Sequence, residues 1–380
     1  MNQTEQILLQ AIQKSLWNTD ITFPENTDWN AVLKEAEDQA ILGVVIGTAP
    51  IEMQKEWKSR SSAGMAHFVR ILHYQSELDK LLKEQEVPYV ILKGTAAAVY
   101  YPNPASRSMG DIDFIVPSNQ FDRTKSVLIE KGYLVEDNPN YPRHIDVSKD
   151  GVSFEMHRFF SEMGIDIERY ITDGLSAAET SSIYGCSFQI LPSTANGLVL
   201  LAHLAFHLKT GLGLRQVIDW MMFVNQELND DAWDCLFREA AEETGLDVIA
   251  ITFTRLCQKY LGLSQQITWC KDADEVLCDQ LMESFLSSGN FGAKRGTGRK
   301  VENTITNLKK DGLRYLQEAG EFNWKAYHKH KWLKPIAWLY QICRYTKQGF
   351  QVKRGAKLKE DIARGNQRNE LLKQLKLGGK

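Results

Sequence analysis

The sequence has few of the residues that would place it in a specialised class of protein. Its 380 residues include only ten prolines and six cysteines, and the cysteines form no CxxC pair. Low proline content together with 43% hydrophobic residues argues against disorder and low complexity. Scattered cysteines in a long chain are typical of reduced thiols rather than of a disulfide framework or a zinc site. We therefore expect a globular protein with a substantial core and buried, reduced cysteines.

The chain also lacks a long hydrophobic run. Its most apolar stretch, residues 195–208, is too short to span a bilayer and contains His203 and His207. Met1 is followed by polar residues, without the basic and apolar segments of a secretory signal. These absences predict a cytoplasmic protein with no transmembrane segment.

The chain as a whole has no large excess of positive or negative charge, but its parts do. Forty-five basic and 48 acidic side chains give a net charge of −3, which by itself disfavours a dedicated nucleic-acid binder. Residues 344–380, however, hold eleven basic and three acidic side chains, a net charge of +8, which leaves −11 for the first 343 residues. The sequence thus joins an acidic body to a basic C-terminal tail, and an anionic partner is a candidate ligand of that tail.

The spacing of apolar residues divides the chain into three regions. Residues 1–85 are predicted to be helical, because apolar side chains recur at helical spacing in 29–40 and 65–83. Residues 86–191 contain short β-like runs, and residues 192–380 return to a helical pattern that includes the basic tail. In this last region helices are expected at 193–209, 214–227, 230–244, 248–261, 274–286, 301–319 and 335–350, with a long glycine-rich loop at 287–299.

The middle region has the pattern of a small α/β unit. Residues 89–92 form a short apolar run that Lys93-Gly94-Thr95 ends, and a helix is expected directly after it. Glycine permits close approach of the backbone, and a helix N-terminus favours phosphate. A second strand is predicted at 112–116, followed by a helix that Ser118 caps and Gly132 ends.

A β-hairpin is predicted around Asp150-Gly151, a dipeptide that favours a two-residue turn. The flanking strands, 143–148 and 152–157, alternate polar and apolar side chains, so each kind lies on its own face. The polar face collects His144, Asp146, Ser148, Ser153, Glu155 and His157. Pairing across the turn is predicted to place the two acids opposite each other and the two histidines opposite each other. This face is either solvated or part of a site.

Asp111 and Asp113 flank Ile112 at the start of the second predicted strand. Alternation projects both carboxylates from the same side of the sheet. Two like charges this close need a counter-charge, and a divalent cation is the natural one. Carboxylates on a rigid strand hold one or two ions in enzymes that act on phosphates. The sequence therefore predicts a magnesium site at this strand.

The order of these motifs resembles that of a bacterial, largely uncharacterised family of nucleotidyltransferase-like proteins with the polymerase-β type of fold. Members of the family read L-K-G, Y-P-x-P, R, D-I-D and E-x-H in that order. The chain matches with Leu92-Lys93-Gly94, Tyr101-Pro102-Asn103-Pro104, Arg107, Asp111-Ile112-Asp113 and Glu155-Met156-His157. The resemblance covers residues 88–157 closely and the helical regions on both sides more loosely.

The resemblance implies an α+β fold, in which a small mixed sheet of the nucleotidyltransferase type forms a catalytic core at 86–191 between the N-terminal and the larger C-terminal helical region. It implies transfer of a nucleotidyl group from an NTP. Carried over to this sequence, Asp111, Asp113 and Glu155 would be the catalytic residues and the ligands of Mg²⁺, with two ions expected. Gly94 and Thr95 would lie against the triphosphate.

Several basic residues are further candidates for nucleotide binding. Better-known enzymes of this fold have Gly-Ser or Gly-Gly where this chain has Lys93-Gly94-Thr95, and the Lys93 ammonium is a candidate phosphate ligand. Arg107 is a candidate phosphate clamp, the alternative being an ion pair with a nearby acid. His144 and His157 are candidates to orient the carboxylates, contact phosphate or ligate metal, with simple packing as the alternative.

Two helices of the C-terminal region carry the remaining candidates. His203 and His207 share one helix face but lack the glutamate of an HExxH zinc site. Arg215 and Asp219 share a face of the next helix and have the spacing of an ion pair. We expect this helix pair to line the nucleotide or acceptor pocket, with His203, His207 and Arg215 binding nucleotide, and a satisfied core is the alternative.

Aromatic and basic residues are interspersed from Trp324 to Tyr345. Packing is the simplest explanation of the aromatic residues, and a surface for RNA, an anionic carrier or a membrane is the alternative.

Together these patterns predict a magnesium-dependent nucleotidyltransferase. It would move an NMP group from an NTP to a hydroxyl of a small molecule, a protein or RNA, and release pyrophosphate. The alternatives are a non-catalytic nucleotide- or partner-binding module that retains the fold, and a two-metal phosphohydrolase, which shares the acids.

Overall fold

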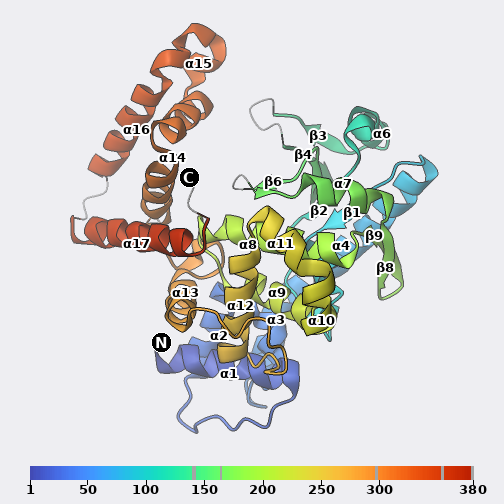
Figure 1. Cartoon of the computed structure of the whole chain (residues 1–380), viewed down its shortest axis with the longest axis vertical. Coiled ribbons are helices and arrows are strands. Elements are labelled where there is room, and N and C mark those ends of the chain that lie inside the picture. Colours follow the sequence, from blue (N-terminus) through green and yellow to red (C-terminus); the bar gives the residue numbers. More distant parts are fainter. Residues whose placement is uncertain (139–142, 163–164, 296–297, 352–354, 378–380) are drawn as a thin grey trace.

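A mixed β-sheet lies at one side of a largely helical molecule (Figure 1). The computed structural model describes all residues except 139–142, 163–164, 296–297, 352–354 and 378–380. The sheet with its flanking helices confirms the predicted α+β class. The division into regions at 85 and 191 stays a prediction.

The N-terminal residues are helical, as predicted. The helices are α1 (Gln3–Trp17), α2 (Trp29–Asp38), α3 (Leu42–Val45) and α4 (Gln54–Glu84). Asn2 starts α1 with a capping box, in which its side chain accepts from the Glu5 amide and its own amide donates to the Glu5 carboxylate. Helix α4 begins eleven residues before the predicted segment 65–83, because its first turns are polar and carry no apolar stripe.

The described residues form a seven-stranded sheet in the order β3-β4-β5-β2-β1-β9-β8. The strands are β1 (Val90–Leu92), β2 (Ile112–Ile115), β3 (Leu134–Glu136), β4 (His144–Lys149), β5 (Val152–His157), β8 (Glu179–Ile183) and β9 (Cys186–Ile190). The pairs β1–β9 and β2–β5 are parallel, and the other neighbours are antiparallel. A separate small hairpin joins β6 (Ser161–Glu162) to β7 (Ile165–Asp166).

The predicted hairpin and its register are confirmed. Strands β4 and β5 pair Asp146 with Glu155 and His144 with His157. Asp150 and Gly151 both have positive φ, 48° and 75°, which a tight turn between twisted strands requires.

Alternation gives the sheet two different faces. Ile112 and Phe114 of β2 join a buried cluster with Phe154 of β5 and with apolar residues of α4. Asp113 and Glu155 project from the opposite face. The sheet therefore packs one face against α4 and turns the acidic residues toward the C-terminal helices.

Short helices connect these strands. They are α5 (Gly94–Ala98), α6 (Phe121–Glu130) and α7 (Glu168–Ser176). Helix α5 begins directly at Gly94, earlier than predicted, and has only five residues. Ser118 is not the cap of α6, because a 3₁₀ turn at Ser118–Gln120 separates it from the helix. Gly132 follows α6 with a φ of 82°, as expected for the residue that ends a helix.

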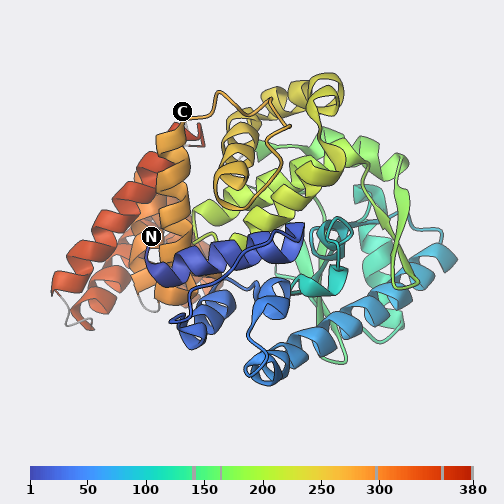
Figure 2. The same ribbon diagram turned by 90° about the horizontal axis from the view of Figure 1, so that it is seen from below.

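The next helices form the largest core. They are α8 (Ser193–Leu208), α9 (Leu214–Glu227), α10 (Asp230–Ala232), a π-helical segment η4 (Trp233–Phe237), α11 (Arg238–Thr244), α12 (Asp247–Tyr260) and α13 (Glu275–Ser288). The N-terminal helix α1 lies across them (Figure 2), and its Trp17 indole donates to the Leu261 carbonyl at 2.6 Å. The first and last thirds of the chain thus share one core.

The predicted loop at 287–299 is partly wrong, because a 3₁₀ segment, η5 (Asn290–Arg295), occupies its middle. Phe291 and Gly292 within it have positive φ values of 53° and 70°. The α8–α9 turn packs directly against this segment. A Cβ atom on Gly211 would lie 2.6 Å from the Gly292 nitrogen, and one on Gly213 would lie 2.6 Å from the Asn290 Cα. Glycines at both positions allow this close approach.

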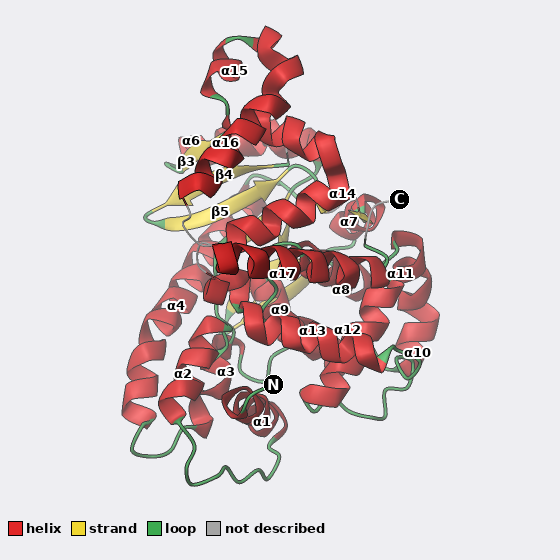
Figure 3. Ribbon diagram, turned by 90° about the vertical axis from the view of Figure 1, so that its left-hand side faces the viewer, coloured by secondary structure: helices red, strands yellow, loops and turns green. Residues whose placement is uncertain are grey.

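A helical hairpin extends away from the rest of the chain (Figures 1 and 3). It consists of α14 (Gly298–Asn323), α15 (Lys325–Lys329), a 3₁₀ turn η6 (Lys331–Ile336) and α16 (Ala337–Gln351). We call residues 298–351 the arm and residues 322–340 its tip. The last helix, α17 (Gly355–Gln374), returns to the body.

Helix α17 holds part of the basic tail in internal ion pairs. Arg364 and Arg368 contact the two oxygens of the buried Glu302 at 3.0 and 2.8 Å. Leu371 and Leu372 of the same helix are buried in the largest core. These two positive charges are therefore neutralised within the fold.

The cysteines only partly follow the prediction. Cys257, Cys270 and Cys278 are buried free thiols, whereas Cys235 and Cys343 are exposed. Cys235 lies on η4 and Cys343 on α16, and both face solvent. The position of a cysteine on its helix, and not its residue type, decides whether it is buried. Within the described residues, no helix is both long enough and apolar enough to cross a bilayer.

Candidate active site

A pocket of about 660 Å³ lies between the sheet and helices α8 and α9. We call its two sides the sheet wall and the helical wall. The sheet wall consists of Lys93, Gly94, Asp111, Asp113, His144, Glu155 and His157. The helical wall consists of His203, Phe206, His207, Arg215 and Phe291. Apart from Thr95, every residue that the sequence singled out for catalysis or nucleotide binding lines this pocket.

The strand register brings the acidic residues together. Asp113 of β2 is paired with Glu155 of β5, and Glu155 is paired in turn with Asp146 of β4. Asp111 directly precedes β2 and also lines the pocket. Asp113 and Glu155, which are 42 positions apart in the sequence, thus become neighbours because β2 pairs with β5.

Lys93 supplies a positive charge inside this acidic group. Its Nζ lies 2.8 Å from Asp113 Oδ1, and both side chains are buried. The residue has φ 55° and ψ −137°, a conformation that favours glycine, so the sharp β1–α5 turn holds it at some cost in strain. The backbone therefore directs the ammonium onto the carboxylate.

The two histidines of the hairpin lie beside the same acids. His157 Nε2 is 3.0 Å from Asp113 Oδ1 and 3.5 Å from Glu155 Oε2. His144 Nε2 is 3.9 Å from Glu155 Oε1, and the two imidazole rings are 5.4 Å apart. Both rings are thus placed to orient the carboxylates.

The electrostatics of the two aspartates differ. Burial and repulsion from Asp113 and Glu155 raise the pKa of Asp111 to about 6. Burial would also raise the pKa of Asp113, but the Lys93 ammonium and the His157 hydrogen bond lower it well below its usual range. Burial would lower the pKa of His157, yet its bonds to the two carboxylates raise it.

These acids fit a divalent cation. The ligand atoms of Asp113, Glu155 and His157 all lie within 4.8 Å of one another. Burial and the neighbouring carboxylates raise the pKa of Asp111, and a bound cation would offset that repulsion. Magnesium prefers carboxylate oxygens, so Asp111, Asp113 and Glu155 are a suitable donor set.

Arg107 lines the pocket, but its guanidinium is bound to Asp219 of α9. Nε and Nη2 of Arg107 each lie 2.7 Å from an oxygen of Asp219, and the Tyr101 hydroxyl donates to the same carboxylate at 2.7 Å. Of the two interpretations of Arg107, the structure shows the ion pair with an acid. This buried cluster joins the Y-P-x-P motif to helix α9.

Arg215 is the arginine that the helical wall presents to the pocket. Asp219 is occupied by Arg107, so Arg215 Nη1 contacts the Ser108 carbonyl at 3.4 Å instead. The Arg215 guanidinium lies 5.1 Å from the centroid of the Phe291 ring. Its Nε is buried and has no hydrogen-bond partner among the described residues. Burial and the nearby Arg107 lower the pKa of Arg215 to about 10.

The histidines of α8 stand together on the helical wall. The rings of His203 and His207 are 4.3 Å apart, and the Phe291 ring lies 4.7 Å from His207. Burial and the charge of Lys93 lower the pKa of His203 well below its usual value. The helical wall therefore offers neutral and cationic nitrogen groups beside an aromatic surface.

The structure does not bring Thr95 to the pocket. Thr95 is buried, and its hydroxyl donates to Gln75 Oε1 at 2.7 Å. Gly94, with a φ of 35°, lines the pocket at the turn.

The sequence interpretation missed several pocket residues. They are His67, Arg143, Phe159, Phe160, Phe206 and Phe291. Their elements meet only in the folded chain, so no local motif marks them. His67 Nε2, for example, lies 2.8 Å from the Gly110 carbonyl although 43 residues separate the two.

Comparison with protein families gives one match. Residues 25–262 match the model of a family described as Uncharacterised nucleotidyltransferase. The matched segment contains the sheet wall and helices α8 and α9, whereas Phe291 and the arm lie beyond it. None of the curated proteins matches the chain.

Proposed function

The chain belongs to the uncharacterised nucleotidyltransferase family, and from this premise we propose that it transfers an NMP group from an NTP to an acceptor hydroxyl with release of pyrophosphate. The observation that carries the proposal is the placement of Asp113 and Glu155 side by side on parallel strands, with Asp111 at the same pocket. Three carboxylates on rigid strands, facing a wall of nitrogen groups, suit a reaction on a polyphosphate.

In the proposed reaction the acceptor oxygen forms a bond to the α-phosphorus of the NTP. The bond between that phosphorus and the oxygen bridging to the β-phosphate breaks, and pyrophosphate leaves with the electron pair. Glu155 either ligates metal or takes the proton of the acceptor hydroxyl. His157, which contacts Asp113 and Glu155, keeps both carboxylates in position.

Asp111, Asp113 and Glu155 would hold magnesium. When bound, the ion would neutralise charge that develops on the phosphate oxygens. Lys93 would keep Asp113 ionised for this purpose, since its ammonium favours the carboxylate form.

The helical wall would bind the nucleotide. Arg215 has a buried nitrogen without a partner among the described residues, and a phosphate oxygen would satisfy it. His203 and His207 would provide further donors, and the Phe291 ring beside them would contact an aromatic base. Arg107 would act indirectly, because its pair with Asp219 positions α9 against the sheet.

The test measures pyrophosphate release and acceptor labelling. The full chain is incubated with MgCl₂ and each α-labelled NTP, together with sugar phosphates, small hydroxyl-bearing antibiotics, protein or RNA as acceptors. Mass spectrometry then identifies the acceptor by its NMP increment. We expect Asp111→Asn to abolish transfer, by about a thousandfold or more, without unfolding the protein.

Asp146→Asn is the matched control. Asp146 lies in the same row across the sheet, on the strand next to Glu155, but its side chain is 65% exposed. It should retain activity within about threefold. Undiminished transfer by Asp111→Asn would contradict the proposal. Calorimetric binding of NTP without pyrophosphate release would instead indicate a binding module, and release of phosphate or NMP without acceptor a hydrolase.

A further inference from the structure

The tip of the arm exposes apolar and basic side chains together. Trp332 is 76% exposed, and Leu339 and Ile336 are 47% and 45% exposed. The same segment carries four exposed lysines, Lys325, Lys329, Lys331 and Lys334. Large apolar side chains that gather on a protruding surface mark an interaction site, because isolated ones are common but clusters are not.

The tip is an ordered part of the fold and not a frayed end. Trp324 stacks on Tyr340 with ring centroids 5.0 Å apart and an interplanar angle of 6°. The Tyr315 and Tyr345 hydroxyls join α14 to α16 at 2.8 Å. Gly320 lets the two helices touch, since a Cβ there would lie 2.0 Å from the Ala337 carbonyl oxygen. These contacts hold α14 and α16 together beside the tip.

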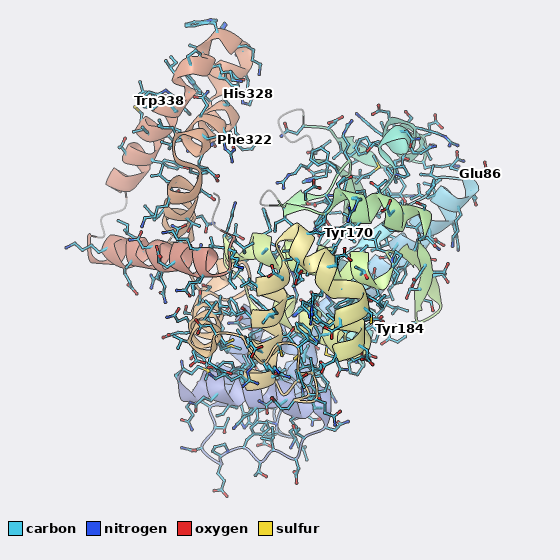
Figure 4. All side chains as sticks on the ribbon, in the orientation of Figure 1. Glu86, Tyr170, Tyr184, Phe322, His328 and Trp338 are labelled. Atoms are coloured by element: carbon cyan, nitrogen blue, oxygen red, sulfur yellow. The ribbon has the colours of Figure 1, made fainter. Side chains whose placement is uncertain are left out.

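Residues 322–340 carry only positive charge, although Glu321, which directly precedes them, lies 3.9 Å from the Lys334 ammonium. No aspartate or glutamate occurs between Glu321 and Glu360, and ten lysines and arginines lie in that interval. The rest of the chain is acidic overall. Figure 4 shows Phe322, His328 and Trp338 on the arm, which projects past the body. A positive tip held away from an acidic body will meet an extended anionic surface before the body does.

The chemistry of the tip favours lipid over nucleic acid. Tryptophan and lysine are the residues that anchor proteins at the boundary between headgroups and acyl chains. Exposed Leu339 and Ile336 cannot stack on bases but gain from contact with hydrocarbon. Trp324 and Tyr340 stack on each other, so those ring faces are not open to bases. Within the tip the cations other than histidine are all lysines, whereas arginine is preferred for nucleic-acid contacts.

We propose that the tip of the arm docks on an anionic phospholipid surface, with Trp332, Ile336 and Leu339 entering the headgroup layer and the four lysines contacting lipid phosphates. This inference is independent of the proposed transfer reaction, because the arm lies outside the family-matched residues and contributes nothing to the pocket. It would place the reaction of the pocket at a membrane surface.

The experiment is flotation of the full chain with lipid vesicles, without nucleotide or metal. Vesicles of phosphatidylcholine alone are compared with vesicles that contain 30% phosphatidylglycerol, about a third anionic lipid, at physiological salt. We expect the protein to float with the anionic vesicles and to remain behind with neutral ones. Raising the salt to 1 M should release it, because the Debye length falls to about 3 Å.

Two tip variants test the two kinds of contact. Replacing Lys329, Lys331 and Lys334 by glutamine should weaken partitioning about fivefold for each lysine. The double change Trp332→Ser and Leu339→Ser should weaken it about tenfold or more, through loss of apolar insertion.

Matched controls lie on the body. Lys55, Lys58 and Lys80 are exposed lysines of α4, and Leu236, which is 66% exposed, lies on η4. Their glutamine or serine variants should float like the unmodified protein. Circular dichroism confirms that every variant is folded.

Three results would overturn the proposal. One is failure to bind anionic vesicles. Another is equal loss of binding in the body controls. The third is binding of single-stranded RNA, or formation of a dimer, that the tip variants abolish while vesicle binding is absent.

Discussion

The two walls of the pocket differ in how their charges are compensated. On the sheet wall, Lys93 and His157 hold Asp113 through contacts of 2.8 and 3.0 Å, so this carboxylate is compensated by partners within the wall. On the helical wall, Arg215 keeps a buried nitrogen without a partner among the described residues. This difference suits a sheet wall that stays fixed during the proposed reaction and a helical wall that would receive the ligand.

The largest effect should come from removing the internal cation of the sheet wall. In Lys93→Met the buried Asp113 loses one of its two partners and keeps only His157, and we expect the free energy of unfolding to fall by about 3 kcal/mol in the absence of metal. Transfer activity should fall by about a hundredfold or more. Millimolar MgCl₂ should restore more stability to this variant than to the unmodified protein, because a cation replaces the lost charge. Urea unfolding with and without MgCl₂ measures this.

Lys125→Met is the control for that variant. Lys125 contacts Asp137 at 2.6 Å, but the pair is largely exposed to solvent. Its loss should cost less than about 1 kcal/mol. If both variants lose the same stability, Lys93 is not the internal cation that distinguishes the sheet wall.

The next largest effect should come from breaking the ion pair between Arg107 and Asp219, which connects the two walls. Arg107→Gln leaves Asp219 buried with only the Tyr101 hydroxyl and should lower the free energy of unfolding by about 3 kcal/mol. Because the Arg107–Asp219 pair positions α9, which carries Arg215, a displaced α9 should also weaken NTP binding. Thermal unfolding and NTP titration measure the two effects. Normal stability with weakened NTP binding would instead make Arg107 a direct phosphate ligand.

Gly211→Ala tests the contact between the α8–α9 turn and the η5 segment that carries Phe291. Gly211 has a φ of 113°, and the added Cβ would meet the Gly292 backbone at 2.6 Å. We expect a loss of about 2 kcal/mol and an increase in KM as Phe291 moves. Gly245→Ala is the control, since Gly245 also has positive φ, 69°, but nothing lies within 4 Å of its added Cβ. The control should lose about 1 kcal/mol and keep its KM. Equal KM values for both variants would remove Phe291 from the site.

The smallest effect on the free energy of unfolding should come from replacing Arg215, the proposed phosphate ligand. Arg215→Gln removes a buried charge that lacks full compensation, so stability should change by less than about 1 kcal/mol. The Kd for NTP should rise about tenfold, since one charge-assisted contact to phosphate is lost. Isothermal titration measures the Kd, with exposed Arg169→Gln as control. An unchanged Kd would show that the helical wall does not receive the triphosphate.

The sheet wall could be predicted from the sequence, whereas the helical wall mostly could not. Alternation and the Asp150-Gly151 turn define the register that pairs Asp146 with Glu155, so local rules suffice there. The pairing of β1 with β9, nearly a hundred residues later, has no local signal. Neither has the bond between Arg107 and Asp219 nor the contact of Phe291 with His207. These depend on how the helices pack, which single-chain periodicity does not reveal.

In the arm, too, the sequence predicts only part of the structure. The aromatic residues from Trp324 to Tyr345 were expected to pack, and the Trp324–Tyr340 pair does. Trp332 does not, because the 3₁₀ turn η6 faces it outward. Residue type thus predicted an apolar segment, but only the turn decides which ring is buried.

The return of α17 to the body has a practical consequence for protease digestion. A single cut within the tip would sever the chain, yet Leu371 and Leu375 in the core and Arg368 on the Lys209 carbonyl would keep the released fragment attached. The nicked protein should migrate as one particle in its native state and as two bands after denaturation. Removal of α17 would instead expose the part of the core that Leu371 and Leu372 cover. Helix α17 therefore holds the end of the chain against α13 and α14.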